Sequence, residues 1–114
     1  MKKVELKDAK RYEAAKHFDV STMRLQGKDE TGLSKFWVGL SHFLPGGGAE
    51  MSAGGPVEKV YVCTAGEITI RTATEEIALR PMDSVFIPVG EAREIVNRTN
   101  LPASMLVIVA YPSQ

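Results

Sequence analysis

Short runs of strand-forming residues, separated by turn signals roughly every ten residues, are the feature that most limits how this chain can fold. Apolar runs at residues 57–64, 68–72 and 104–111 are divided by segments rich in glycine, proline and acidic residues. No segment shows a convincing helical spacing of its apolar residues. Many short strands with frequent turns are typical of a sandwich or barrel, so the sequence predicts an all-β fold.

The longest expected strand, residues 32–44, has two faces that alternate along it. One face holds Phe36, Val38, Leu40, His42 and Leu44, and the other holds Trp37, Gly39, Ser41 and Phe43. We expect the first face to point inward, which would carry His42 into the interior. The proline and glycines at residues 45–48 are expected to end this strand.

Other elements follow from shorter patterns. Residues 2–6 alternate charged and apolar side chains and predict a short edge strand, whereas residues 8–17 predict one turn or irregular structure. Residues 57–64 and 68–72 flank a tight turn at Gly66 and are expected to pair as a hairpin. Further strands are expected at residues 20–25, 77–79, 85–87, 93–96 and 104–111.

Composition excludes several classes of protein. The 114 residues suit one domain, and the 14 basic and 14 acidic residues lack the basic excess of a nucleic-acid-binding protein. Residues 103–111, the longest apolar run, fall far short of the roughly 20 residues that span a bilayer. Cys63 has no partner for an intrachain disulfide and is expected in the core. We therefore expect a cytoplasmic protein without nucleic-acid or membrane partners.

Two glycine-containing stretches, residues 47–66 and 82–97, stand out by their internal spacing. Their spaced residues are Gly47 and Gly66 in the first stretch and Pro88, Gly90 and Asn97 in the second. This spacing resembles the two motifs of the cupin family across residues 32–111. The resemblance implies an all-β, cupin-type double-stranded β-helix, or jelly-roll barrel, formed by a single domain of residues 1–114. Residues 32–111 would form the barrel core, and residues 1–31 an N-terminal segment with a strand that could be exchanged.

The resemblance usually implies a metal held by three histidines and one glutamate, but this chain departs from that pattern. The four ligand positions of the family fall on Ala53, Gly55, Lys59 and Arg93. Ala53 and Gly55 offer no side-chain ligand, and the positive charges of Lys59 and Arg93 would repel a cation. We therefore expect no metal and no other cofactor.

One alternative retains a metal. A one-residue bulge could turn Glu58 inward in place of Lys59. His42, Glu50 and Glu58 would then form the unorthodox ligand set of a metal-dependent cupin enzyme.

Lys59 and Arg93 otherwise indicate an anion site. The planar guanidinium suits a carboxylate or phosphate, and a partly desolvated lysine can have its pKa lowered towards proton-transfer chemistry. The candidate catalytic residues are His42, Lys59, Glu58 and Tyr61, and the candidate ligand-binding residues are Arg93, Glu50 and Met51.

These residues predict a protein that binds a small anionic molecule, carboxylated or sugar-like, inside the barrel. Metal-independent isomerase, lyase or decarboxylase chemistry would suit such acid–base residues. The alternative is a non-catalytic ligand-binding or dimeric accessory protein, in which the cations pair with glutamates at the barrel rim. A cavity filled by Phe36, Leu40, Met51, Tyr61 and Met105 would favour that alternative.

A homodimer is the expected assembly. Its basis is the resemblance, because small cupins usually pack sheets face to face or exchange an N-terminal strand. The strand around Trp37 and Phe43 has a second apolar face that needs covering. Residues 4–6 are the candidate for strand exchange.

Overall fold

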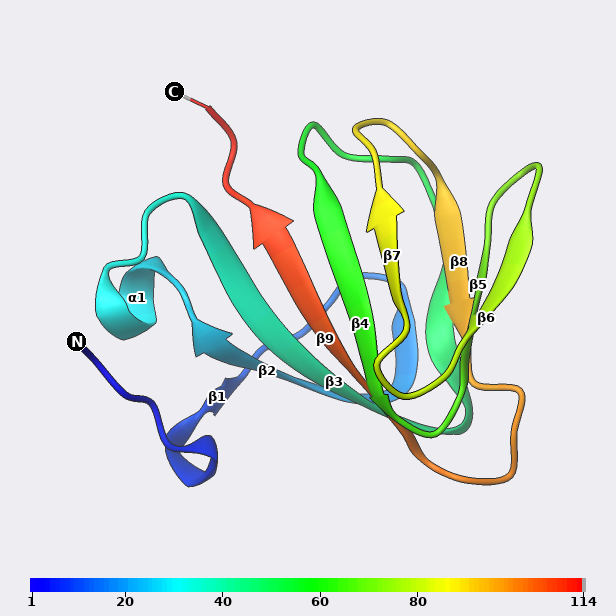
Figure 1. Ribbon diagram of the computed structural model, residues 1–114, viewed down its shortest axis with the longest axis horizontal. Coiled ribbons are helices and arrows are strands. Elements are labelled where there is room, and N and C mark those ends of the chain that lie inside the picture. Colours follow the sequence, from blue (N-terminus) through cyan, green and yellow to red (C-terminus); the bar gives the residue numbers. More distant parts are fainter. Residues whose placement is uncertain (114) are drawn as a thin grey trace.

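The computed structural model describes residues 1–113, which form a nine-stranded antiparallel sheet rolled into a barrel (Figure 1). The strands are β1 (Lys10–Arg11), β2 (His17–Gln26), β3 (Phe36–Ser52), β4 (Lys59–Ala65), β5 (Ile68–Arg71), β6 (Glu76–Leu79), β7 (Ser84–Ile87), β8 (Arg93–Val96) and β9 (Ala103–Ala110). Two short helical turns, η1 (Leu6–Asp8) and α1 (Lys28–Thr31), accompany them. The predicted all-β fold is confirmed.

The long strand β3 links the two sides of the barrel, because it changes partner along its length. Residues 36–43 pair with β9, whereas Gly48 and the residues that follow it pair with β8. The prediction that residues 45–48 end the strand is therefore wrong. Gly46 takes a left-handed φ of 83°, and a side chain on Gly48 would clash with the carbonyl of Ile95 on β8. These glycines bend β3 across the barrel instead of ending it.

The predicted hairpin of residues 57–64 with residues 68–72 does not form. Strand β4 pairs with β7 and β9, while β5 pairs with β6 and β8. Gly66, at a φ of 72°, approaches Pro102 and Ala103 closely at the end of the barrel. The chain therefore crosses there to the opposite side, where β5, β6 and β8 stand together in Figure 1.

The N-terminal residues also differ from the prediction. Residues 2–6 form no strand, and Leu6, the apolar residue at the end of this segment, is exposed. The first strand is β1, which pairs with β2. Strand β2 pairs with β3 in turn, so part of the N-terminal segment 1–31 extends the barrel sheet.

The two faces of β3 are the reverse of those expected. Gly39, Ser41 and Phe43 are buried inside the barrel, whereas Phe36 is 41% exposed and His42 lies on the outside. The side chains of β3 alternate between two faces, as predicted, but both faces are apolar enough to pack against other residues. The outer residues belong to an apolar surface that spans β3, β9, β4 and β7. We call this surface, formed by Val38, Leu40, Val60, Val62, Phe86, Leu106 and Ile108, the outer apolar face.

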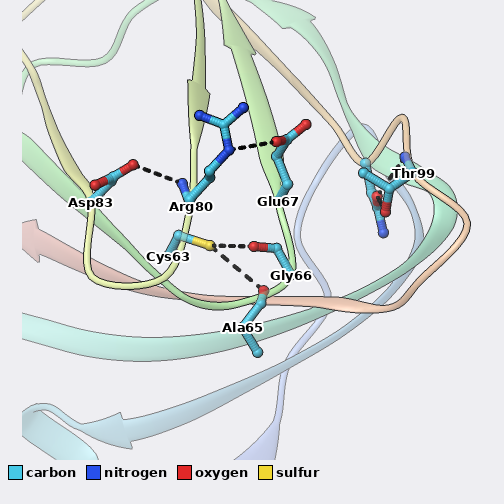
Figure 2. Close-up of polar contacts among 8 residues, drawn as sticks. Cys63, Ala65, Gly66, Glu67, Arg80, Asp83 and Thr99 are labelled. Carbon is cyan, nitrogen blue, oxygen red and sulfur yellow. Dashed lines mark hydrogen bonds and ion pairs between the residues drawn. The ribbon is translucent and has the colours of Figure 1, made fainter.

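Polar contacts hold one end of the barrel. The side chain of Asn97, fully buried, donates to the carbonyls of Phe43, Leu44 and Leu101 at 3.3, 3.3 and 2.8 Å. Figure 2 shows the neighbouring turn, where Arg80 pairs with Glu67 at 3.1 Å. These contacts tie the strands together at the end of the barrel opposite the first residues of β4 and β8, Lys59 and Arg93.

Cys63 lies in the core, as the sequence predicts, with no exposed surface. Its sulfur contacts the carbonyls of Ala65 and Gly66 (Figure 2). Desolvation by burial raises the pKa of this thiol, so the reactive thiolate is disfavoured. Within residues 1–113, no helix is long and apolar enough to cross a membrane.

Candidate functional site

A cavity of about 190 Å³ lies inside the barrel, between the inner face of the sheet and the N-terminal segment. Residues of β3, β4, β8 and β9, the first residue of β2 and the segment before it line the cavity. The apolar part of the wall includes Trp37, Phe43 and Met105. The polar side chains of the wall are Tyr12, His17, Ser41, Lys59, Tyr61 and Arg93. The cavity is therefore not filled by the apolar residues that a purely structural barrel would require.

Arg93, the first residue of β8, is held in place by two hydroxyl groups. Its Nε donates to the hydroxyl oxygen of Tyr61 at 2.7 Å, and its Nη1 donates to Oγ of Ser52 at 2.8 Å. Its guanidinium carbon also lies 5.9 Å from the centre of the Tyr61 ring. Because both hydroxyls accept from Arg93, each keeps its own hydrogen for donation to another acceptor.

Lys59, the first residue of β4, brings a second positive charge to the same cavity. Desolvation by burial, followed by repulsion from Arg93, holds the pKa of this amine below its ordinary value. Within residues 1–113, neither Lys59 nor Arg93 forms an ion pair with a carboxylate. Glu94, which could have paired with Arg93, pairs with Arg71 at 3.1 Å instead. The cavity wall thus carries two cations without a protein counter-charge.

Two tyrosines border these cations. Tyr61 is 2% exposed, and burial raises the pKa of its hydroxyl even though Arg93 opposes this effect. Tyr12 also has a pKa raised by burial, partly offset by Arg24. The guanidinium of Arg24 stacks over both Tyr12 and Trp37, at 5.1 and 4.2 Å from the ring centres. Both tyrosines therefore remain neutral hydroxyl donors near pH 7.

An open recess of about 690 Å³ adjoins the cavity. Tyr12, Ala14 and His17 line both spaces, so they separate the inner cavity from the recess. Two carboxylates, Glu13 and Asp19, line the recess but not the inner cavity.

The structure separates the sequence-predicted site residues into two groups. Lys59, Tyr61 and Arg93 line the cavity, as described above. His42 does not: it is exposed on the outside of β3, where its Nδ1 lies 2.7 Å from Oγ of Ser104. The expectation that His42 points inward is wrong, because the face of β3 was assigned from a pattern that suits either side.

The other predicted residues lie away from the cavity wall. Glu50 and Glu58 are exposed, and Met51 is 39% exposed. The register of β4 is regular from Lys59 to Val62 against β7 and from Lys59 to Cys63 against β9, so no bulge at Lys59 turns Glu58 inward. Hence His42, Glu50 and Glu58 do not come together as the alternative metal site requires. No three histidine, cysteine or acidic side chains are grouped to hold a metal anywhere in residues 1–113.

Four cavity residues escaped the sequence analysis as functional candidates: Tyr12, His17, Trp37 and Ser41. Tyr12 and His17 lie far from both motifs, and only the path of the N-terminal segment brings them to the cavity. The alternation along residues 36–43 could have found Trp37 and Ser41, had the correct face been chosen.

The family's metal does not fit this cavity. Of its four ligand positions, Ala53 and Gly55 supply no donor atom, while Lys59 and Arg93 both line the cavity as cations. Arg93 is moreover committed to Tyr61 and Ser52 by hydrogen bonds. These residues would repel a divalent ion rather than bind it.

Comparison with known proteins agrees with the barrel and its motifs. A family model described as Cupin domain matches residues 39–109. The chain belongs to the cupin family. This cupin is 46% identical over 112 residues to a Mycobacterium tuberculosis protein named beta-D-galactosidase, covering 98% of this chain and 96% of that protein.

Solved cupin structures share the fold. A structure described as a sugar phosphate isomerase from Silicibacter pomeroyi superposes with a TM-score of 0.82 and is 26% identical, covering 97% of this chain and 76% of that one. The polyketide cyclase from Streptomyces resistomycificus superposes with a TM-score of 0.84, covering 96% of this cupin and 79% of the cyclase. Because the cyclase is only 18% identical, it supports the fold alone.

Proposed function

We propose that this cupin binds a small carbohydrate that carries a carboxylate or phosphate, and that Lys59 and Arg93 hold its anionic group inside the barrel. The observation that carries this proposal is the pair of cations on the cavity wall without a protein counter-charge in residues 1–113. Leaving such charges partly desolvated and unpaired costs free energy. A bound anion would recover that free energy.

The neighbours of Arg93 support recognition of a sugar acid or sugar phosphate. Tyr61 and Ser52 fix the guanidinium, and the hydroxyl hydrogen of Tyr61, which lines the cavity, can donate to a ligand oxygen. Trp37 and Met105 supply apolar wall against the carbon skeleton. The cavity, at about 190 Å³, is smaller than the roughly 300–1,000 Å³ of sites for drug-sized ligands, so a monosaccharide is the appropriate size class.

Acid–base chemistry without a metal is the reaction class that we propose for this site. Lys59, whose pKa lies below the ordinary lysine value, more easily takes part in proton transfer than a solvated lysine. Two cations can also stabilise negative charge that develops on a carbonyl oxygen. Isomerisation of a sugar fits these features, and the 26% identical neighbour is described as a sugar phosphate isomerase.

Ligand binding can be measured without a label, because Trp37 is the single tryptophan of the chain and lines the cavity. D-Galacturonate and D-galactose 6-phosphate should change the tryptophan emission at concentrations where neutral D-galactose does not. The Arg93→Ala variant should bind the anionic sugars roughly 10 to 100 times more weakly, as expected for about 1.5–3 kcal/mol of charged hydrogen bonding.

Arg98→Ala is the matched control, because it also removes an arginine but lies outside the cavity, paired with Glu76 at 2.9 Å. It should bind the anionic sugars as the unmodified protein does. Equal affinity of Arg93→Ala and the unmodified protein for both anionic sugars would sink the anion-site proposal.

Hydrolysis of β-D-galactosides is a second candidate function, favoured by the 46% identity to a protein named beta-D-galactosidase. Glycosidases generally use two carboxylates that flank the scissile bond. The inner cavity wall offers none among the described residues, but Glu13 and Asp19 line the adjoining recess. A chromogenic β-D-galactoside should then be cleaved by the unmodified protein and by neither Glu13→Gln nor Asp19→Asn. Absence of cleavage by the unmodified protein would reject this candidate.

We also propose that two copies of this cupin pack through their outer apolar faces. The face contains no charged side chain, although Phe86 is 54% exposed. Contiguous apolar surface of this kind marks a contact with another protein. A second copy presents the same uncharged surface, and the formal net charge of zero creates no long-range repulsion between copies.

A further inference from the structure

His17 stands at the boundary between the inner cavity and the outer recess, because its side chain lines both spaces. The chain contains two histidines, and the other, His42, lies on the outside of the barrel. His17 is thus the only imidazole that the cavity contains within the described residues 1–113.

The hydrogen bonding of His17 determines its tautomer. Its Nδ1 lies 2.8 Å from the carbonyl oxygen of Ala15. A carbonyl can only accept a hydrogen bond, so Nδ1 carries the proton and donates it. In the neutral imidazole, Nε2 therefore keeps a free lone pair that can accept a proton.

The backbone around His17 is held in an uncommon conformation. Lys16 and Asp19 have positive φ values of 61° and 50°, and they are two of only three non-glycine residues with positive φ in residues 1–113. The Lys16 carbonyl accepts from the amide of Glu50 at 3.0 Å, and His17 pairs with Ala49 on β3. Such strain tends to persist at functional positions where the surroundings enforce it. Here the enforced segment is the one that presents His17.

We propose that His17 is the catalytic acid–base residue of the cavity, through its Nε2 atom; this inference rests on the proposed binding of an anionic sugar. Nε2 takes a proton from the carbon next to the sugar carbonyl. The electron pair of that C–H bond forms a C=C bond, and the carbonyl electron pair moves onto its oxygen.

The resulting enediolate carries a negative charge, which the positive potential of Lys59 and Arg93 in the same small cavity stabilises while these two residues hold the anionic group of the sugar. Nε2 then returns its proton to the former carbonyl carbon, while the hydroxyl proton passes from one oxygen to the other. The product is an isomer of the sugar, so the sequence of steps needs no oxidant, reductant or metal.

The test uses D-galacturonate and D-galactose 6-phosphate in D₂O and follows exchange of the hydrogen next to the carbonyl by proton NMR. The full-length His17→Asn variant should lose this exchange by roughly 100-fold or more, the usual contribution of general acid–base catalysis. The asparagine amide can still donate to the Ala15 carbonyl, so the segment keeps its anchor while losing the basic nitrogen.

His42→Asn is the matched control, because it removes the histidine outside the cavity; it should exchange at the unmodified rate. Binding of both sugars by His17→Asn, measured by Trp37 emission, should stay within about threefold of the unmodified value, since 0.6 kcal/mol or less is expected to change. Binding retained with exchange lost would support the role of His17.

The remaining outcomes separate this inference from the function on which it rests. If the unmodified protein binds the sugars but catalyses no exchange, or if His17→Asn exchanges at the unmodified rate, the inference is overturned and the anion site stands. If the unmodified protein binds neither sugar, the anionic-sugar proposal fails and the role of His17 fails with it.

Discussion

The polarity of the two faces of β4 is the reverse of that in an ordinary half-buried strand. Lys59 and Tyr61 point into the barrel, whereas Val60 and Val62 belong to the outer apolar face. A sheet with one solvated side normally places polar residues outside and apolar residues inside. This reversal supports the two proposals made above, in which the inside of the barrel retains charges for a ligand and the outside retains apolar surface for a second copy.

The contrast also explains why the cavity persists. Met105, Val107 and Val109 of β9 line the cavity and also belong to the hydrophobic core, so Lys59 and Arg93 share the cavity wall with core residues. Two like charges that are partly desolvated and lack a counter-charge cost folding free energy. Retaining Lys59 and Arg93 next to each other is therefore a cost to folding that binding of an anion can offset.

The largest of the predicted effects is a loss of dimer affinity, which is expected when a charge is placed on the outer apolar face. Leu106 lies at the centre of this face, paired with Leu40 and Val62. Leu106→Glu should weaken the dimer at least 100-fold, because burying an unpaired carboxylate costs several kcal/mol. Molar mass from light scattering at micromolar concentration should change from dimer to monomer.

The control for this substitution is Leu101→Glu, which adds the same charge at a 68% exposed leucine outside the face. It should remain dimeric. A monomeric unmodified protein at the same concentration would contradict the assignment of the outer face to a second copy.

An intermediate effect, on ligand affinity, is expected when the positive charge at Arg93 is kept but its hydrogen-bonding geometry is changed. Arg93→Lys preserves the positive charge. A lysine, however, cannot donate hydrogen bonds to both Tyr61 and Ser52 and also present a planar pair of donors to a ligand. The affinity of this variant for D-galacturonate should fall about threefold to fivefold, which is less than the roughly 10- to 100-fold loss expected for Arg93→Ala. Calorimetric titration would check this order, and equal affinities of the two variants would mean that charge contributes nothing.

The smallest effect concerns stability and its dependence on pH. Burial and Arg93 place the folded-state pKa of Lys59 below the ordinary value of 10.5. Below the lowered pKa, Lys59 is charged in both states and its destabilising effect is fully present. Between the lowered pKa and 10.5 only the unfolded state binds the proton, so stability rises with pH.

The Lys59→Met variant should therefore unfold at higher urea concentration than the unmodified protein at pH 7, with an advantage that shrinks as the pH approaches 10.5. Lys35→Met, at an exposed position, serves as the control and should show no such trend. A stability difference for Lys59→Met that is independent of pH would show that Lys59 titrates as a solvated amine.

The sequence predicted the barrel and part of its wall for a specific reason. The motif spacing assigned Lys59 and Arg93 to two of the family's ligand positions, and both residues line the cavity. The path of the chain at Gly46 could not be predicted, because a glycine that ends a strand and one that bends it have the same local pattern.

His42 and His17 show the limit of the pattern most clearly. The face of His42 was misassigned because the outer apolar face makes both sides of β3 look like core. His17 could not be predicted as a cavity residue, because its position depends on the pairing of β2 with β3 and on two left-handed residues that no motif marks.

A crystal structure of the protein with D-galacturonate tests the central claim most directly. The account predicts one sugar inside the barrel, with its carboxylate within hydrogen-bonding distance of Arg93 and Lys59 and its carbonyl end towards His17. A sugar bound only in the outer recess, or a divalent metal between Lys59 and Arg93, would contradict the account.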